Sequence, residues 1–544
     1  MSRKRFWATA AATVVSIGLP GPSLAATLNV PGDFATIQAC IDAAVSGVDE
    51  CVAAPGTYHE TINFLGKAIT LRSSGGADVT TIDATGLGGS VVTCATAESS
   101  DTVLDGFTIT GGTGADHFGN GYSYGGGMLN DYSSPTVTNC TFSGNTAYAG
   151  GGIYNWVSSS TVTDSTFSAN SAGGGGGGGG MANIGGRPAV TDCTFDSNSA
   201  TGNVGYGGGI YNNGSGLIVR RCTFTGNVAN NGGAMFNEFS SPTVSNCTFS
   251  ANSGRSGGAM LNIYWSSPKV TNCTIARNRA NLGGGGGMLS SSHSSPRVTT
   301  CTFSGNTADF GGGGMSAIFD SNPTVTNCTF WVNSAAQGGG LESFKNSNPT
   351  VANCILWGNT DSSGTGESAQ VHTAGGAPMI TYSIVQGGWN GASGIGVLDA
   401  DPVFVDPDGP DGIAGTEDDN LRLMPGSPAI SAGNNDALPP DLADLDGDGD
   451  NSEPTPTDLE GHARVLCGRV DMGAYEFGIG DYYCDQAVNL NDFAGWSSCM
   501  NGPQATALAD EPPVAPGCEA FDFDGDGDVD LADFAAFQRV LTAP

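Results

Sequence analysis

The segment DFDGDGDVDLAD, residues 522–533, carries oxygen-bearing side chains at the spacing of a calcium-binding loop. Such a loop surrounds one Ca²⁺ with ligands from positions 1, 3, 5, 7, 9 and 12, and a glycine at position 6 permits its sharp bend. Gly527 holds position 6, and the ligand positions are held by Asp522, Asp524, Asp526, Asp528 (through its carbonyl), Asp530 and Asp533. The sequence therefore predicts a calcium site here, followed by a helix over FAAFQRVL.

A second, imperfect loop lies upstream in DYYCDQAVNLND, residues 481–492. Its positions 1, 5, 9 and 12 are held by Asp481, Asp485, Asn489 and Asp492. However, Tyr483 stands where position 3 needs an oxygen ligand, and Gln486 replaces the glycine of position 6. This loop is a degenerate candidate, and whether it binds calcium is left open.

A third acidic stretch alternates carboxylates with other residues, at Asp444, Asp446, Asp448 and Asp450. A loop with this alternation can direct several carboxylates at one hard cation. No Glu follows at the twelfth position, so the stretch is not an EF-hand. It is either a calcium-binding loop or a solvated acidic loop.

Residues for catalysis are harder to find. The five histidines are scattered, and no recurring Ser or Asp constellation accompanies them. A glycosidase needs only two carboxylates at a suitable separation. If adjacent turns of a repetitive fold bring them together, the candidates are Asp131, Asp164, Asp192 and Asp196. This is a weak signal, and no catalytic residue is assigned.

The fold that must position these groups is indicated by an internal repeat. Nine copies of a C-T-F-x-x-N block, or a close variant, follow one another every 25 to 29 residues from Cys140 onward, each preceded by Gly-Gly-x and a large apolar residue. Such a period is typical of solenoids. Apolar and polar residues alternate within the blocks, and turn residues interrupt them every few positions, which predicts short strands. We expect a parallel β-helix in which Cys140, Phe142, Asn145 and their equivalents stack as columns.

Charge and the N-terminal segment favour an exported protein. Residues 1–25 contain Arg3, Lys4 and Arg5, an apolar stretch and small residues before a cleavage site, as in a signal peptide. No other segment is apolar and long enough to span a bilayer. The formal net charge of −34 argues against nucleic acid as a partner. Most of the imbalance lies at the C-terminal end, where residues 399–544 hold 31 Asp or Glu and four Arg.

Two resemblances concern the repetitive part. The F-x-x-N and G-G-[AG]-[ILM] phrases over Gly125–Asn359 resemble the repeat of the polymorphic outer membrane proteins, which are surface adhesins. VPGDFATIQACIDAAVSG and the residues after it resemble the opening of pectin-lyase-like right-handed β-helices. Asp33 is a candidate N-cap of a helix in this segment, which would cover the N-terminal end of the coil, and Cys40 and Cys51 are candidates for a disulfide there. Many such proteins cleave acidic polysaccharides, but the Arg base of the lyases and the G-H-G and R-I-K motifs of polygalacturonases are missing.

Two further resemblances concern the C-terminal part. GSPAISAG and GRVDMGAYEF resemble the choice-of-anchor Q region of secreted bacterial β-helix proteins, which implies apolar strands that finish the coil. The loop with Val529 at position 8 and Asp533 at position 12 resembles the type I dockerin loop. A dockerin implies a cohesin partner, but Leu531-Ala532 and Leu490-Asn491 replace the usual contact pairs. Cys484, Cys499 and Cys518 are candidates for a supporting disulfide.

Together these observations predict an all-β, right-handed parallel β-helix with a small α-helical, calcium-binding dockerin-like module. We expect a signal peptide (1–25), the β-helix (26–400, with its cap in 26–50 and regular repeats in 125–360), acidic final turns (401–478) and the module (479–544). The predicted role is adhesion, carbohydrate contact or envelope architecture in a secreted or cell-surface protein. Its partners would be a cohesin-like or cell-envelope protein and a polysaccharide. The alternative is a polysaccharide lyase or glycoside hydrolase on the same coil.

Overall fold

A computed structural model describes residues 25–478 except 203, 392, 393, 442 and 446–448. Beyond 478 it describes residues 481, 483, 484, 496, 499, 518–521, 523, 529, 533–536 and 538. The predicted signal peptide and most of the calcium-loop residues therefore lie outside the described residues.

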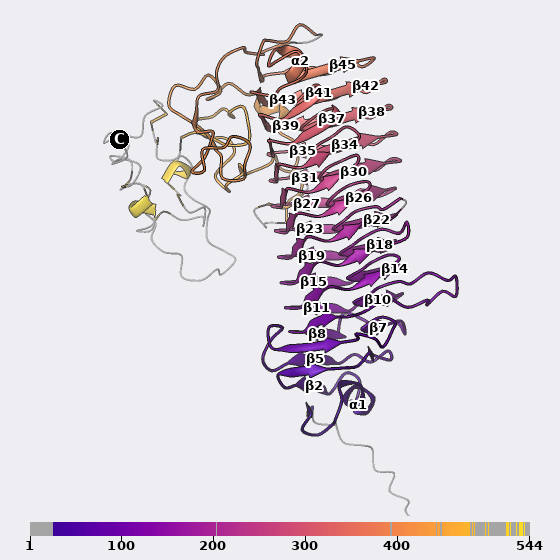
Figure 1. The fold of residues 1–544 in the computed structure, drawn as a ribbon. Helices are drawn as coiled ribbons and strands as arrows, with labels where there is room; N and C mark the ends of the chain where they lie inside the picture. Colours follow the sequence, from indigo (N-terminus) through magenta and orange to yellow (C-terminus); the bar gives the residue numbers. More distant parts are fainter. Residues whose placement is uncertain are drawn as a thin grey trace, which may run out of the picture.

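The described chain winds into a solenoid whose turns stack along one axis (Figure 1). In the regular part, each turn passes in order through sheets that we name C, A, B and D, and equivalent strands of successive turns pair in parallel. In this part, Thr flanks a central Val or Phe in most of the three-residue strands of sheets A and B, and Gly, Asn and Ser are frequent at the bends between strands. The predicted parallel solenoid is confirmed.

The strands of sheet A are, in order, β1 (Thr27–Val30), β2 (Glu50–Ala53), β5 (Thr70–Ser73), β8 (Val103–Asp105), β11 (Thr136–Thr138), β15 (Thr161–Thr163), β19 (Ala189–Thr191), β23 (Ile218–Arg220), β27 (Thr243–Ser245), β31 (Lys269–Thr271), β35 (Arg297–Thr299), β39 (Thr324–Thr326), β43 (Thr350–Ala352) and β46 (Met379–Thr381). Those of sheet B are β3 (Gly56–Tyr58), β6 (Thr80–Asp83), β9 (Thr108–Thr110), β12 (Thr141–Ser143), β16 (Thr166–Ser168), β20 (Thr194–Asp196), β24 (Thr223–Thr225), β28 (Thr248–Ser250), β32 (Thr274–Ala276), β36 (Thr302–Ser304), β40 (Thr329–Trp331), β44 (Ile355–Trp357) and β47 (Ile384–Val385).

The strands of sheet C are β4 (Ile62–Asn63), β7 (Val92–Cys94), β10 (Met128–Asp131), β14 (Ile153–Trp156), β18 (Met181–Ile184), β22 (Ile210–Asn213), β26 (Met235–Glu238), β30 (Met260–Ile263), β34 (Met288–Ser291), β38 (Met315–Ile318), β42 (Leu341–Phe344) and β45 (Val371–Ala374). Those of sheet D are β13 (Thr146–Ala147), β17 (Ser171–Ala172), β21 (Ser199–Ala200), β25 (Val228–Ala229), β29 (Ser253–Gly254), β33 (Arg279–Ala280), β37 (Thr307–Gly311) and β41 (Ser334–Gln337). The described helical segments are α1 (Ile37–Ala43), α2 (Glu367–Gln370), η1 (Asn435–Ala437) and η2 (Glu519–Phe521).

The interior consists of the predicted columns. Phe142 stacks on Phe167 with ring centroids 5.0 Å apart and planes 5° from parallel, and Phe195 continues the column 4.6 Å further on. Asn145 and its equivalents form a buried ladder, in which each side-chain oxygen accepts hydrogen bonds from the preceding turn, as Asn170 does from Asn145. The ladder satisfies backbone groups at a bend that would otherwise be buried without partners.

The predicted cysteine column is present, and its thiols are buried and form no disulfide bonds. Each thiol from Cys193 to Cys354 donates to the carbonyl two residues earlier, for example Cys247 to Ser245 at 3.1 Å. Ser165 and Ser383, which hold the same position in other turns, donate in the same way. A thiol or a hydroxyl at this position can thus donate the same hydrogen bond to the backbone.

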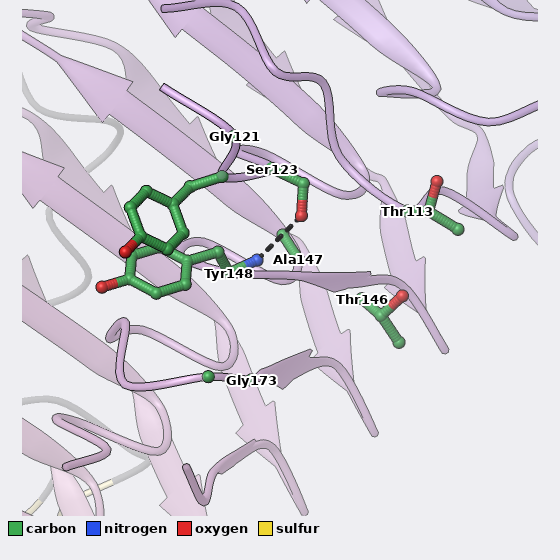
Figure 2. Close-up of a pocket in the computed structure, with 9 residues that line it drawn as sticks. Thr113, Gly121, Ser123, Thr146, Ala147, Tyr148 and Gly173 are labelled. Atoms are coloured by element: carbon green, nitrogen blue, oxygen red, sulfur yellow. Dashed lines mark hydrogen bonds between the residues drawn. The ribbon is translucent and has the colours of Figure 1, made fainter. Parts of the chain in front are cut away.

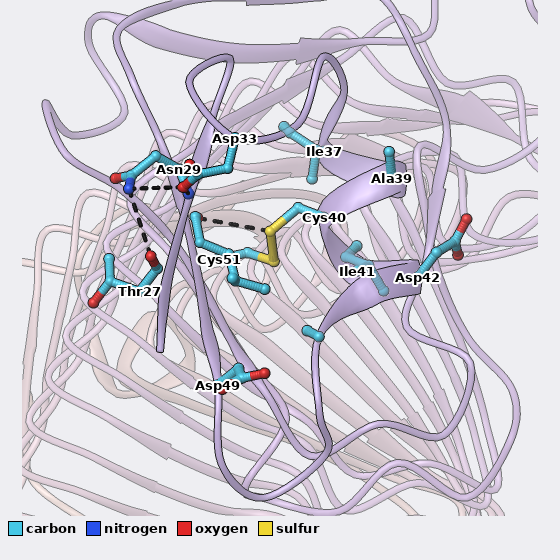
Figure 3. The surroundings of a disulfide bond; sticks show 12 residues. Thr27, Asn29, Asp33, Ile37, Ala39, Cys40, Ile41, Asp42, Asp49 and Cys51 are labelled. Carbon is cyan, nitrogen blue, oxygen red and sulfur yellow. Dashed lines mark hydrogen bonds between the residues drawn. A yellow bond between two sulfur atoms is a disulfide. The ribbon is translucent and has the colours of Figure 1, made fainter. Parts of the chain in front are cut away.

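The N-terminal end is covered by α1, and Figure 3 shows the predicted disulfide between Cys40 and Cys51 beside it. The predicted N-cap was wrong. Thr36, not Asp33, caps α1, because the Thr36 hydroxyl accepts from Ala39 N at 3.1 Å. Asp33 lies in the preceding turn, where its carboxylate accepts from Asn29 N and its own N–H donates to the Asn29 carbonyl.

Residues 401–478, which we call the C-terminal strap, differ from the expected final turns of the coil. Its described strands β48 (Phe404–Asp406) and β49 (Asn420–Leu423) pair only with each other, and antiparallel. Figure 1 shows the strap, in orange, lying alongside the later turns. Solenoid side chains hold it: Asn327, at a bend, donates to the Asp471 carbonyl at 3.2 Å, and Arg220, at the end of β23, donates to the Ala443 carbonyl at 3.0 Å.

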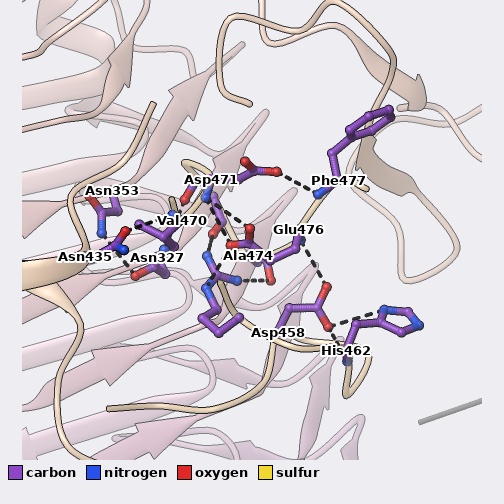
Figure 4. Close-up of polar contacts among 12 residues, drawn as sticks. Asn327, Asn353, Asn435, Asp458, His462, Val470, Asp471, Ala474, Glu476 and Phe477 are labelled. Carbon is purple, nitrogen blue, oxygen red and sulfur yellow. Dashed lines mark hydrogen bonds and ion pairs between the residues drawn. The ribbon is translucent and has the colours of Figure 1, made fainter. Parts of the chain in front are cut away.

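A buried polar cluster connects the strap to the solenoid (Figure 4). Arg464 is 1% exposed, lies 3.2 Å from the Glu476 carboxylate and donates to the carbonyls of Gly473 and Ala474. Burial raises the pKa of Glu476 and raises that of Asp471 to about 6. Because burial disfavours the ionised form, these carboxylates depend on Arg464 and on backbone N–H donors.

A disulfide from Cys467 to Cys484 joins the strap to the C-terminal segment, and a second bond joins Cys499 to Cys518. The predicted pairing among the C-terminal cysteines is thus confirmed for Cys499 and Cys518. Cys484 instead pairs outside the predicted set, with Cys467 of the strap.

The candidate functional surface on sheet C

Of the four carboxylates that the sequence grouped as catalytic candidates, the solenoid brings only Asp164 and Asp192 together. Asp131 ends β10 in sheet C, whereas Asp164 and Asp192 occupy the bend between sheets A and B on neighbouring turns. Asp196 lies in sheet B. Asp192 is also engaged by Arg221, whose two donors lie 2.7 Å from its carboxylate oxygens and lower its pKa. The expected four-residue cluster was therefore wrong, because stacking unites only residues at the same position in the repeat.

Sheet C presents the richest chemistry on its outer face. The first and third residues of its strands point inward, and the second and fourth point outward. The second residues from β10 to β45 are Leu129, Tyr154, Ala182, Tyr211, Phe236, Leu261, Leu289, Ser316, Glu342 and His372. Sequence reasoning missed this surface, although the Gly-Gly-x-apolar phrase marks it: the residue directly after the apolar one faces outward.

An aromatic cluster covers the N-terminal part of this face. Phe118, from the loop between β9 and β10, contacts Tyr124 and Trp156 with ring centroids 5.0 and 5.3 Å apart. Tyr124 in turn lies 4.8 Å from Tyr154. Beside them the Nε2 atom of His117 is 2.8 Å from Oδ2 of Asp131. The cluster therefore combines aromatic faces with one polar pair.

The cluster continues into an open pocket of about 440 Å³ (Figure 2). Tyr122 and Tyr148 form one wall, with ring centroids 4.2 Å apart and planes inclined by 32°. Hydroxyls of Thr113, Ser123 and Thr146 line the remainder, together with the backbone of Gly173 and Gly174. The Ser123 hydroxyl also accepts from Tyr148 N at 3.1 Å, which fixes the turn that carries Tyr148. Aromatic walls beside hydroxyls suit a ligand that has both apolar faces and hydroxyl groups.

Three carboxylates lie on the outer face of sheet C. Glu238 accepts from the Tyr211 hydroxyl at 3.0 Å, and Glu342 accepts from the Ser316 hydroxyl at 2.6 Å. Burial raises the pKa of Glu342. Glu238 lies four turns from Asp131 and four from Glu342, which at about 4.8 Å per turn is about 19 Å. A glycosidase needs carboxyl groups roughly 5 to 9.5 Å apart, so these pairs do not fit.

The predicted calcium ligands are only partly described. Asp533 is 1% exposed, and its Oδ1 accepts from Phe523 N at 2.6 Å. Asp444 accepts from Gly449 N, and Asp450 accepts from Ser452 N. Asp481 is buried. The others lie outside the described residues: Asp446, Asp448, Asp485, Asn489, Asp492, Asp522, Asp524, Asp526, Asp528 and Asp530. Among described residues, no three His, Cys, Asp or Glu side chains group as metal ligands.

Comparison with known proteins found a family model that matches part of the solenoid. Residues 175–303 and 208–400 match the family model of the right handed beta helix region. Two solved structures are similar at 13% identity: pectate lyase Pel9A (TM-score 0.35; 84% of this chain, 96% of that one) and the A-module of the mannuronan C-5 epimerase AlgE6 of Azotobacter vinelandii (TM-score 0.32; 69% and 100%). Neither similarity bears on the function of this chain. No curated protein matches it significantly. Over residues 175–400, the parallel solenoid is similar to right-handed β-helix regions, as the sequence predicted.

Proposed function

We propose that this protein is exported and contacts a polysaccharide, without catalysis, through the aromatic cluster and pocket on the solenoid. The observation that carries the proposal is the Tyr122–Tyr148 wall beside three hydroxyl-bearing residues. Sugar rings have apolar faces that pack on aromatic rings and hydroxyls that exchange hydrogen bonds. The three disulfides support export, because such bonds persist in oxidising compartments.

Rigidity of the scaffold favours this role. The pocket residues lie on a loop and on bends anchored to paired strands, so little ordering is needed when a ligand binds. The carboxylate separations on sheet C argue against a glycosidase site there. The part of the chain that the structure describes contains no helix long and apolar enough to cross a membrane.

Removal of the Tyr122 ring tests the pocket. We expect Tyr122→Ala to weaken polysaccharide binding on the order of tenfold, because one stacked aromatic contact contributes about 1 kcal/mol or more. Binding of the mature protein to a panel of soluble neutral and acidic polysaccharides can be measured by affinity electrophoresis.

Phe310→Ala is the matched control, because Phe310 is also an exposed aromatic, at 64%, but lies on β37 far from the pocket. If Tyr122→Ala and Phe310→Ala are slowed equally during electrophoresis by every polysaccharide that slows the wild type, the pocket is not the contact site.

We further propose that the C-terminal module binds calcium and anchors the protein to a cohesin-like or cell-envelope partner. Asp522, Asp524, Asp526, Asp528, Asp530 and Asp533 would hold the ion. The nearly buried Asp533 carboxylate, beside a small core of Trp496, Phe521 and Val529, fits the twelfth position of such a loop.

Calcium titration of the mature protein by calorimetry tests this assignment. We expect Asp522→Ala combined with Asp526→Ala to abolish the tightest binding event, because two charged ligands of one ion are lost. The double variant Asp444→Ala, Asp450→Ala in the strap should leave that event intact. Tight binding that survives the first double variant would show the loop assignment to be wrong.

A further inference from the structure

A row of exposed aromatic residues follows the corner between sheets C and A, away from the pocket. Phe239, Tyr264, Trp265 and Phe319 are 54%, 41%, 63% and 42% exposed, and each comes directly or one residue after a strand of sheet C. His293 holds the equivalent place on the turn between Trp265 and Phe319. We call these five residues the aromatic ridge. Figure 1 shows that the turns stack along one axis, so residues at equivalent corners follow one another along that axis.

Folding alone does not favour these residues at this corner. Phe239 and Trp265 have φ values of 49° and 59°, a region that bulky side chains rarely adopt. Equivalent corners on other turns carry Tyr132, Val157, Gly185, Gly214, Ser292 and Lys345, so the fold accepts small and polar residues at this place as well as aromatic ones. Aromatic residues on successive turns from Phe239 to Trp265 are therefore not required by the fold, which is consistent with a role other than stability.

The ridge exposes ring edges rather than ring faces. Phe239 stacks on Tyr264, and Trp265 stacks on His293, in both cases with centroids 5.4 Å apart and planes within 19° of parallel. Since these partners lie on successive turns, the faces cover one another along the solenoid axis. A polysaccharide lying along the ridge would find few free faces for stacking, whereas the projecting edges can insert into a soft apolar layer.

Basic side chains flank the ridge. Lys269 and Arg297 stand at the same outward position on neighbouring strands of sheet A, and neither forms an ion pair with any residue that the structure describes. Like charges in register disfavour folding. On the ridge itself, Lys345 Nζ lies 4.4 Å from the Phe319 ring centroid, and Asp320 is the neighbouring acidic residue.

The charge of this region is opposite to that of the whole chain. Residues 201–300 contain seven Lys or Arg and one acidic residue, Glu238, whereas the formal net charge of the chain is −34. Of these seven cations, Arg221 pairs with Asp192, Arg279 pairs with Asp309, and Arg220 holds the strap. The cations that stand beside the ridge are Lys269 and Arg297, together with Lys345 of a later turn. Since charges are screened beyond about 8 to 10 Å at physiological salt, these three determine the charge that a surface touching the ridge meets first. An anionic surface is therefore the complementary partner.

We propose that the aromatic ridge and its flanking cations form an edge that binds the surface of an anionic lipid bilayer. Trp, Tyr and Phe edges enter the boundary between headgroups and acyl chains, and Lys269, Arg297 and Lys345 lie at the level of the lipid phosphates. A ridge that follows the solenoid axis can touch a flat surface with several turns at once. This contact is independent of the polysaccharide pocket, which lies on another part of the turn.

The test is sedimentation of the mature protein with vesicles of phosphatidylcholine, alone or with about 30% phosphatidylglycerol. We expect binding to the anionic vesicles only, and its decrease at high salt. Phe239→Asn with Trp265→Asn should lower the affinity by at least about tenfold, because both apolar side chains are lost. Lys269→Gln with Arg297→Gln should lower it by about thirtyfold.

Asparagine is chosen because it adopts this backbone conformation readily, so the aromatic double variant should melt at the wild-type temperature or above. Phe310→Ala is the matched control and should bind as the wild type does. The proposal is overturned if no vesicle is bound, if neutral and anionic vesicles are bound equally, or if either double variant binds as the wild type does. It is also overturned if a soluble acidic polysaccharide is bound through these residues and vesicles are not.

Discussion

Phe195→Ala is expected to destabilise the solenoid by about 3 to 5 kcal/mol. Phe195 is completely buried, and its ring lies 4.6 Å from that of Phe167 and 4.8 Å from that of Phe224, nearly parallel to both. Truncation leaves a cavity in the middle of a stack, and paired strands on both sides prevent the neighbours from closing it. Denaturant unfolding of the mature protein, followed by circular dichroism, measures the loss.

The control is Phe195→Leu, because Ile275 and Leu356 already hold this position on other turns. We expect a loss of about 1.5 kcal/mol or less for that variant. Because solenoids can unfold in parts, the transition should also be followed by hydrogen exchange of the neighbouring strands. Equal stability of the alanine variant and the wild type would mean that the column is not closely packed.

Asn227→Ala is expected to cost on the order of 3 to 6 kcal/mol, since several buried partners lose their hydrogen bonds together. The Asn227 side chain donates to the Phe195 carbonyl and to Asn252, and it accepts from the backbone and side-chain nitrogens of Asn198. After truncation, these groups remain buried without water or an alternative partner. The melting temperature of the mature protein, determined by calorimetry, reports the effect.

Asn230→Ala is the matched control, since Asn230 belongs to the same turn, is half-buried and makes one side-chain hydrogen bond, to the Gly202 carbonyl. It should cost about 1 kcal/mol. If the two variants melt at the same temperature, the ladder is not a main source of stability.

The columns could be predicted because they repeat. When a residue type recurs every 25 to 29 positions, each copy can be predicted to stack on the next copy. Phe142, Phe167 and Phe195 do so. One column was nevertheless overlooked. The third residues of the sheet C strands form a second buried asparagine ladder, as where Asn130 donates to Asn155 at 2.8 Å. Its signal was present in the recurring N of GGMLN and GGIYN.

The candidate site could not be predicted in the same way. The sequence grouped Asp131 with Asp164, although they lie at different corners of the turn. The pocket was not anticipated, because it combines Tyr122 from a single inserted loop with Tyr148 from the next turn. Because such features occur once in the chain, they produce no repeated pattern in the sequence from which they could be predicted.

The sequence by itself determined the parallel stacking and the identity of three inner columns, because both depend on contacts between equivalent positions one repeat apart. Only the tertiary structure decided where the strap lies, that Arg464 is buried beside Glu476, and which faces of the coil stay open. These arrangements join residues as far apart as Arg220 and Ala443. The contacts between strap and solenoid are stabilised by shape and charge complementarity between two surfaces. Because these surfaces exist only after the coil has formed, no local sequence pattern predicts the contacts.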